Sequence, residues 1–171
     1  MSYDLMNRRD NVTNHHTGIE GSLTTIDTYL ERGMTASKMN LGFAFYAKWF
    51  TTADGATCDQ PTGCKTAVME APDGSDTGLS GAVTFETENF NGGAFVNAMN
   101  NGKTDTEKGG QWFWDASAKV YWTWDTPELI GRKFTEIVKA KGLGGVMAWS
   151  LAQDSHDWSH LKAMQAGVKG L

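Results

Sequence analysis

The residues of this chain best suited to chemistry are polar and aromatic side chains at the ends of short apolar runs. Tyr3 and Asp4 offer a hydroxyl and a carboxylate near the N-terminus, and Trp149 ends the apolar run 146–149. Trp presents a flat apolar face and one N–H donor, which suits the alternating C–H and hydroxyl faces of a pyranose ring. The chain holds seven Trp, eight Phe and four Tyr. Most of these rings are expected in the core, including the four tryptophans between residues 112 and 124.

A second candidate is the cysteine pair, Cys58 and Cys64. These residues enclose Asp-Gln-Pro-Thr-Gly, a Pro/Gly turn that could bring the two thiols together, so we expect a disulfide. A zinc site would need more ligands than the pair offers. Disulfides persist in oxidising compartments, and residues 11–13 form a glycosylation acceptor pattern. Both features favour a secreted, extracellular protein, and the lack of a signal-peptide pattern is expected if the front of the chain is missing.

The four histidines give a weaker signal. His15 and His16 lie in a polar stretch and are expected to face water. His156 and His160 are four residues apart, a spacing that can bind zinc on a helix. The zinc-protease pattern needs a Glu at the position of Asp157 and a third ligand. We therefore predict no metal site and no cofactor.

Length and charge exclude several classes of protein. With 171 residues, the chain can form a domain with a core, but a complete (β/α)8 barrel needs about 250 residues. The net charge of −5 and the lack of a basic run argue against a nucleic-acid partner. No apolar stretch approaches the ~18 residues of a membrane span, so no membrane partner is expected.

Hydrophobic periodicity predicts an α/β chain with three parallel strands and an inserted, loop-rich α+β region. The expected elements are strand 1–6, helix 19–30, strand 39–46, a hairpin with arms 111–114 and 120–124, a helix from 127, strand 146–149 and helix 158–168. Thr126 is placed to cap the helix that Pro127 begins. The predicted division is 1–49 and 125–171 for the parallel part and 50–124 for the insertion.

Three motifs in this order resemble glycoside hydrolase family 18 chitinases. Met1-Ser2-Tyr3-Asp4 matches the family's Met/Gln-x-Tyr-Asp at the end of barrel strand six. Gly42-Phe-Ala-Phe-Tyr46-Ala-Lys48 is similar to its strand seven, and Gly144-Gly-Val-Met-Ala-Trp149-Ser-Leu to its strand eight. Residues 4–13 and 15–18 resemble the fungal killer-toxin type. The resemblance implies a partial TIM barrel, strands six to eight, with the chitinase insertion domain.

The same resemblance implies a substrate and a set of contacts. The substrate would be chitin or a chitooligosaccharide, a β-1,4-linked N-acetylglucosamine polymer, cleaved with retention by a mechanism in which the sugar's own acetamido group attacks. The implied substrate-binding residues are Met1, Tyr3, Asp4, Tyr46, Lys48 and Trp149. Two positions depart from the family pattern: Lys48 replaces Arg, and Ala47 replaces Gly. A lysine supplies a point charge in place of a planar fork.

The family's general acid has no counterpart in this sequence. It lies in Asp-x-x-Asp-x-Asp-x-Glu, and neither acidic cluster of the chain, at 73–76 or 105–107, fits that pattern. General acid catalysis is commonly worth roughly 10²–10⁴-fold in rate, so we assign no catalytic residue and predict that the chain alone is inactive. Two functions stay open: part of a chitinase, partnered by the missing N-terminal half of the barrel, or a protein that binds chitin fragments or a barrel half without catalysis.

Overall fold

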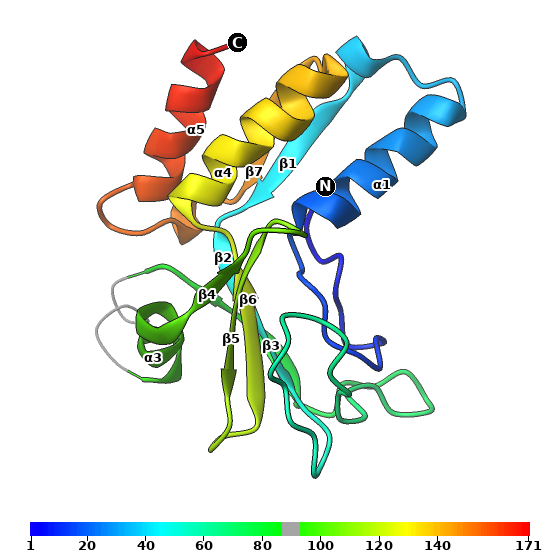
Figure 1. The fold of residues 1–171 in the computed structure, drawn as a ribbon, viewed down its shortest axis with the longest axis vertical. Helices are drawn as coiled ribbons and strands as arrows, with labels where there is room; N and C mark the ends of the chain where they lie inside the picture. Colours follow the sequence, from blue (N-terminus) through cyan, green and yellow to red (C-terminus); the bar gives the residue numbers. More distant parts are fainter. Residues whose placement is uncertain (87–92) are drawn as a thin grey trace.

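The computed structural model describes residues 1–86 and 93–171 and shows a mixed α/β fold with two sheets (Figure 1). The smaller sheet pairs β1 (Asn40–Ala44) with β7 (Gly145–Trp149) in parallel. Its helices are α1 (Ile19–Glu31), α4 (Pro127–Lys133), which continues as a π-helical segment over Phe134–Lys139, and α5 (Ser159–Lys169). Short 3₁₀ turns cover Ala36–Lys38 and Leu151–Gln153.

One core joins this small sheet to its helices. Alternate residues of β1, Leu41 and Phe43, turn toward the helices and are buried, and the Phe43 ring stacks on Phe134 at 5.5 Å between centroids. Ile26 of α1 and Ile130 of α4 belong to the same cluster. Strands alternate their side chains between two faces, so the other face of β1 and β7 remains for a different role.

The larger sheet has five strands in the order β3-β2-β6-β5-β4 and lies below α1, α4 and α5 in Figure 1. Its elements are β2 (Tyr46–Thr51), β3 (Ser80–Thr84), β4 (Lys103–Asp105), β5 (Gly110–Asp115) and β6 (Val120–Trp124), with α3 (Ala94–Asn101) packed beside it. All the strand pairs are antiparallel. Trp112, Trp122 and Trp124 are buried within it, as expected for the rings of this region.

Two predictions about the strands are wrong. Residues 1–6 form no strand, so the described residues contain two parallel strands and not three; the segment passes close to β1 without the hydrogen bonds of a ladder. The apolar run 39–46 is divided, because the chain bends at Phe45 and continues as β2 in the other sheet. Since β2 extends to Thr51, the larger sheet crosses the predicted boundary at residue 49.

The signals that depend on local chemistry are confirmed. Thr126 caps α4, because its hydroxyl oxygen accepts the Leu129 N–H at 3.2 Å. The hairpin β5–β6 turns at Asp115, whose carboxylate accepts the backbone N–H groups of Ser117 and Ala118. Helices α1 and α5 lie within one or two residues of their expected bounds.

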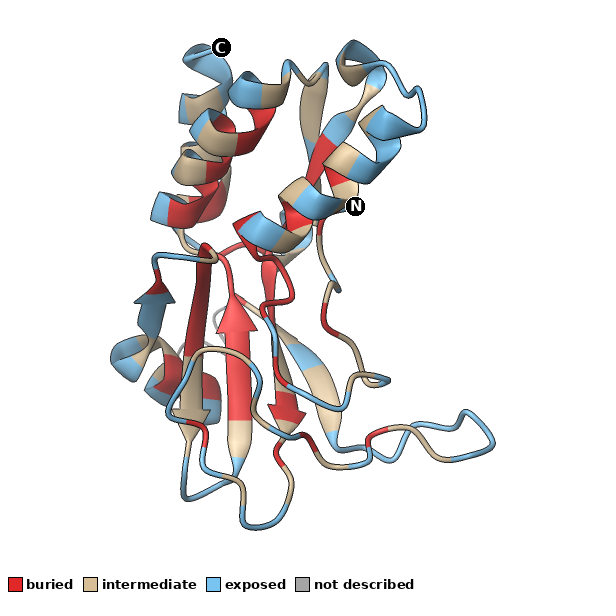
Figure 2. Ribbon diagram, turned by 45° about the vertical axis from the view of Figure 1, so that its right-hand side comes forward, coloured by how far each residue is buried: buried red, intermediate tan, exposed pale blue. Residues whose placement is uncertain are grey.

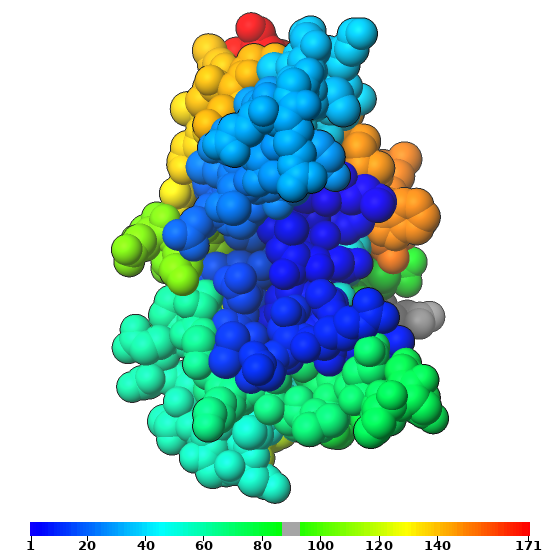
Figure 3. All heavy atoms as spheres, turned by 90° about the vertical axis from the view of Figure 1, so that its right-hand side faces the viewer, coloured from blue at the N-terminus to red at the C-terminus, as the bar shows by residue number. Residues whose placement is uncertain are grey.

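The N-terminal segment lies between the small sheet with its helices and the larger sheet with its loops. Figure 3 shows residues 1–18 lying between α1 and the loops that follow β2. Buried residues are concentrated in the inner faces of the helices and in β1, β2, β5 and β6 (Figure 2). Among the described residues, no helix is long and apolar enough to cross a membrane.

Cys58 and Cys64 form the predicted disulfide. Its loop is packed rather than free, because Tyr121 donates its hydroxyl to the Pro61 carbonyl at 2.7 Å and Cys64 N–H donates to Thr13 at 3.0 Å. Closing a loop of this length lowers the conformational entropy of the unfolded chain, which stabilises the folded state by about 2 kcal/mol. A Cys58→Ser/Cys64→Ser variant is expected to lose about that much free energy of unfolding in urea. An unchanged unfolding midpoint would show that the loop is held by its hydrogen bonds alone.

Candidate functional site

Asp4, Tyr46 and Lys48 meet at one carboxylate oxygen. Asp4 Oδ1 accepts the Tyr46 hydroxyl at 2.8 Å and lies 3.1 Å from Lys48 Nζ. Asp4 adopts a left-handed backbone conformation with φ 57°, which non-glycine residues rarely adopt and which often marks functional positions. Half of its side chain is exposed (51%), whereas that of Lys48 is 15% exposed. Three of the predicted contact residues therefore form one polar cluster that opens to solvent.

The two tyrosines lie against each other beside this cluster. The Tyr3 and Tyr46 rings are 6.0 Å apart and nearly perpendicular. Burial, and then the hydrogen bond to Asp4, raise the pKa of the Tyr46 hydroxyl well above its ordinary value. The buried Tyr3 hydroxyl oxygen has no hydrogen-bond partner among the described residues, and burial raises the Tyr3 pKa too. Both hydroxyls are therefore protonated at neutral pH, and Tyr3 retains an unused donor.

Met1 and Trp149 lie on the same face of the small sheet. Gly42 pairs with Met147, and Ala44 with Trp149, so these four positions share the face opposite the helices. A side chain at Gly42 would lie 3.0 Å from Met1 Cα and 3.1 Å from the Tyr3 ring, which places residues 1–3 on that face. Met1 and Trp149 are 85% and 55% exposed. Met1, Tyr3 and Trp149 therefore lie on this face, and the Tyr3 ring connects it to Tyr46 and so to the Asp4–Lys48 cluster.

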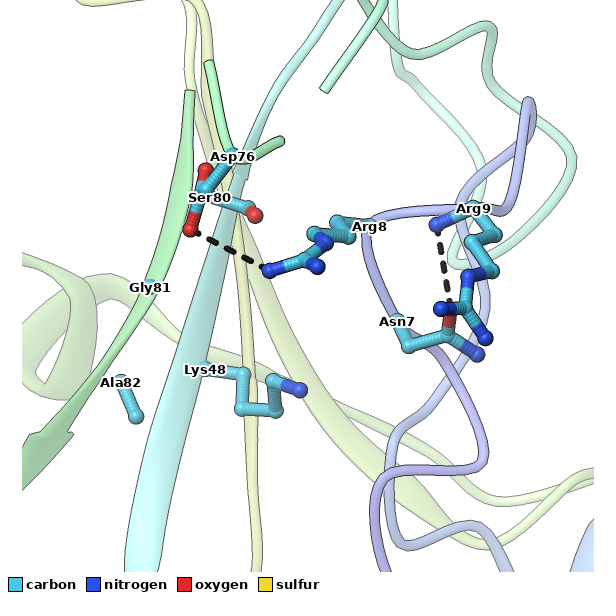
Figure 4. A pocket seen from close by; sticks show the side chains of 8 residues that line it. All are labelled: Asn7, Arg8, Arg9, Lys48, Asp76, Ser80, Gly81 and Ala82. Carbon is cyan, nitrogen blue, oxygen red and sulfur yellow. Dashed lines mark hydrogen bonds and ion pairs between the residues drawn. The ribbon is translucent and has the colours of Figure 1, made fainter. Parts of the chain in front are cut away.

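A cleft of about 380 Å³ begins at Lys48. Figure 4 shows the Lys48 side chain extending into the space between the loop of residues 7–9 and strands β2 and β3. The lining residues are Asn7, Arg8, Arg9, Lys48, Asp76, Ser80, Gly81 and Ala82. Sequence reasoning assigned no role to the arginines or to residues 76–82. The arginines lie in a stretch noted only for its resemblance, and 76–82 carry no motif.

Glu70 fixes the wall of this cleft. It accepts Arg8 Nε at 2.7 Å and Arg9 Nε at 3.0 Å, and Arg8 also donates to the Gly74 carbonyl and approaches Asp76 at 3.6 Å. The hydrogen bonds from Arg8 and Arg9 lower the pKa of Glu70. Ion pairs thus hold the loop after residue 6 against the loop of residues 65–79.

The prediction that His15 and His16 face water is wrong. Their exposed fractions are 1% and 0%, because the polar loop folds inward against partners distant in sequence. His15 Nε2 lies 2.9 Å from the Asp105 carboxylate, and the His16 ring lies 5.3 Å from that of Tyr46. His160 is also buried, with Nδ1 2.7 Å from Asp154. No group of metal-binding side chains of the described residues could hold an ion.

The buried histidines predict acid sensitivity. Burial lowers the pKa of His15 despite its bond to Asp105, and lowers that of His16 further. Because the unfolded-state pKa is about 6.5, only the unfolded chain takes up these protons as the pH falls below that value. The contribution of these histidines to stability is therefore present above about pH 6.5 and is lost as the pH falls below that value. The slope of the free energy of unfolding approaches about 1.4 kcal/mol per pH unit for each histidine. The pKa of Asp105 is lowered, so Asp105 stays ionised in this range.

Urea unfolding at pH 7.5, 6.5 and 5.5 measures this loss, and His16→Phe should reduce its slope. A free energy of unfolding that is flat from pH 7.5 to 5.5 would contradict the assignment of both histidines as buried neutral groups.

The two acidic clusters serve the fold. Asp73 accepts the Ser75 hydroxyl and N–H within its own exposed turn, and these bonds lower its pKa. Asp105 binds His15 and the N–H groups of Glu107 and Lys108. A general acid must hold its proton near neutral pH, and lowered pKa values do the opposite. Asp73 and Asp105 therefore do not supply one. Asp4, Lys48 and Tyr3 offer polar groups that can hold a ligand.

Comparison with known proteins gives a consistent result. The sequence model of Glycosyl hydrolases family 18 matches residues 1–154. Chitinase A1 of Niallia circulans is 32% identical over 130 residues, which are 74% of this chain and 17% of that protein.

Solved chitinases share the fold. The Rhizomucor miehei chitinase is similar with a TM-score of 0.75 and 17% identity, over 98% of this chain and 52% of that one. A family 18 chitinase from Cycas revoluta, solved in complex with (GlcNAc)3, is similar with a TM-score of 0.73 and 21% identity, over 98% and 45%. The chain spans about half the length of these structures. On the family match over most of its length, the chain belongs to glycosyl hydrolase family 18.

Proposed function

We propose that this chain is the substrate-binding, C-terminal part of a chitinase of the fungal killer-toxin type. It would hold the segments that correspond to strands six to eight of a TIM barrel, of which the first, residues 1–6, lies beside β1 without forming a strand. Residues 1–49 and 125–171 would belong to the barrel and 50–124 to the insertion, although β2 crosses that boundary. The Cys58–Cys64 disulfide supports an extracellular location. The ligand would be a chitooligosaccharide.

One observation carries the proposal: the Asp4 carboxylate, with Tyr46 and Lys48 on one oxygen, opens to solvent beside the exposed Trp149 face. An acceptor, donors and a flat aromatic ring together suit a sugar that carries hydroxyl and acetamido groups. Met1 and Tyr3 complete the proposed contacts. No residue of the chain is proposed as the general acid.

The purified chain is expected to bind GlcNAc oligomers without cleaving them. Isothermal titration with the trimer to hexamer measures binding, and chromatography of the same mixtures measures cleavage. Cellohexaose is the control, because it shares the β-1,4 linkage and lacks the acetamido group. Cleavage by the chain alone would contradict the prediction that it lacks a general acid. Equal affinity for cellohexaose would contradict the assignment of chitin as the ligand.

A second candidate function is association with the other half of a barrel. The face of β7 exposes Met147 (37%) and Trp149 (55%), followed by Leu151 (53%), and an apolar strand face without a covering layer favours assembly. Mixing the chain with a separately produced N-terminal half of a family 18 barrel, which carries the strand-four acid, tests it. Co-elution with recovered chitinase activity supports association, and separate elution contradicts it.

A further inference from the structure

His16 is fully buried, yet neither of its ring nitrogens has a hydrogen-bond partner among the described residues. Buried polar side chains nearly always have one, and each exception requires an explanation. His15, its neighbour in sequence, bonds to Asp105. One ring nitrogen of His15 thus has a partner, whereas neither ring nitrogen of His16 has one within hydrogen-bond geometry in the described part of the chain.

The ring lies directly behind the proposed sugar-binding cluster. His16 Nδ1 is 4.0 Å from Asp4 Oδ1, the same oxygen that binds Tyr46 at 2.8 Å and Lys48 at 3.1 Å. A hydrogen bond would need a separation about 1 Å shorter. The imidazole thus lies just beyond bonding distance of a carboxylate that now has two other donors.

The parts of this cluster differ in their freedom to move. His16 is enclosed, whereas 51% of the Asp4 side chain is exposed. Lys48 lines the open cleft of Figure 4, so a polar ligand in the cleft competes with Asp4 for its ammonium group. If the Lys48 ammonium group moved to the ligand, the Tyr46 hydroxyl would be the one remaining donor, among those described above, to Asp4 Oδ1. A small inward shift of Asp4 would restore a second donor.

We propose that His16 is a positioning residue for Asp4: its Nδ1–H donates to Asp4 Oδ1 when a sugar in the cleft draws Lys48 away. The inference rests on the proposed function and adds a residue that does not touch the ligand. Five titratable groups act on this ring or lie against it: Asp4, His15, Tyr46, Lys48 and Lys133. Burial and the two lysines keep it neutral, although the Tyr46 backbone favours the charged form. A neutral ring has one N–H to donate.

Three substitutions separate donation from packing. His16→Asn places an amide at the position of Nδ1, His16→Gln places one at the position of Nε2, and His16→Phe keeps a ring without donors. The ligand is the GlcNAc trimer, and affinity is measured by titration of the full 171-residue chain. We expect Asn to retain affinity within about threefold, and Phe and Gln to lose about tenfold or more, as for a hydrogen bond to a charged group.

The proton itself can be observed in the unmodified chain. Nitrogen-15 NMR of the His16 ring is expected to place the N–H on Nδ1 in the trimer complex, with a hydrogen-bonded shift absent from the free protein. This readout does not depend on whether the Phe variant folds. A trimer complex with the proton on Nε2, or equal affinity of the Phe variant and the unmodified chain, overturns the inference and leaves the proposed function intact. Failure of the unmodified chain to bind the trimer overturns both.

Discussion

Asp125→Ala is expected to lower the free energy of unfolding by about 3–5 kcal/mol, because it leaves a buried ammonium group without its partner. Lys133 Nζ lies 2.5 Å from Asp125 Oδ2, and the two side chains are 1% and 0% exposed. Thr17 donates to the other oxygen at 3.1 Å, and His160 Nε2 lies 3.2 Å from the Asp125 carbonyl. One residue thus links the N-terminal loop, α4 and α5.

Two controls distinguish this effect from loss of packing. The double variant Asp125→Leu/Lys133→Met removes both charges and is expected to recover most of the stability, since apolar replacements of a buried pair are often neutral. Asp54→Ala removes a surface ion pair with Lys119, in which the nitrogen and oxygen are 2.8 Å apart and the Asp54 side chain is 99% exposed. This variant is expected to leave the urea midpoint unchanged. If the double variant is as unstable as the single one, the loss comes from shape and not from charge.

The Asp125–Lys133 pair illustrates which features the sequence could predict. The helix that contains Lys133 was predicted from Thr126, Pro127 and an apolar stripe, all of which are local signals. That Lys133 points inward was not predicted, because a lysine is almost never fully buried unless it is paired with an opposite charge. Its burial depends on Asp125, eight residues away, and on Phe43, whose ring lies 5.8 Å from the ammonium group.

The same distinction holds at the candidate site. Tyr3, Asp4, Tyr46 and Trp149 could be predicted because motif order placed them on neighbouring segments. Arg8 and His16 could not, because the residues that they contact are distant in sequence: Arg8 binds Glu70, 62 residues away, and the His16 ring lies against Tyr46 of β2. Charge pairing across the chain, rather than periodicity, folds the loop of residues 7–18 inward. The division of the run 39–46 between two sheets was missed for a related reason, since both halves are equally apolar.

Removal of the Trp149 ring from the face of β7 is expected to cause the largest loss of affinity for GlcNAc oligomers. Trp149→Ala is expected to weaken binding of the GlcNAc hexamer by roughly 30- to 150-fold, about 2–3 kcal/mol, if about 100 Å² of apolar surface is buried against a sugar. Titration at fixed temperature measures the change. Trp149 is exposed and contributes little to the core, so the melting temperature should not change.

Trp158 is the matched control for Trp149. It is 46% exposed and precedes α5, and it lies outside the β1–β7 sheet, so Trp158→Ala should bind the hexamer as tightly as the unmodified chain. Asp4→Asn should weaken binding by about tenfold or more, as for a hydrogen bond to a charged group. Asp27→Asn, at an exposed pair with Lys141, should not. Equal losses at Trp149 and Trp158 would mean that the chain binds sugars through exposed indoles in general. A loss confined to Trp149 and Asp4 would place the ligand across the face of β1 and β7 and against the Asp4 cluster beside it.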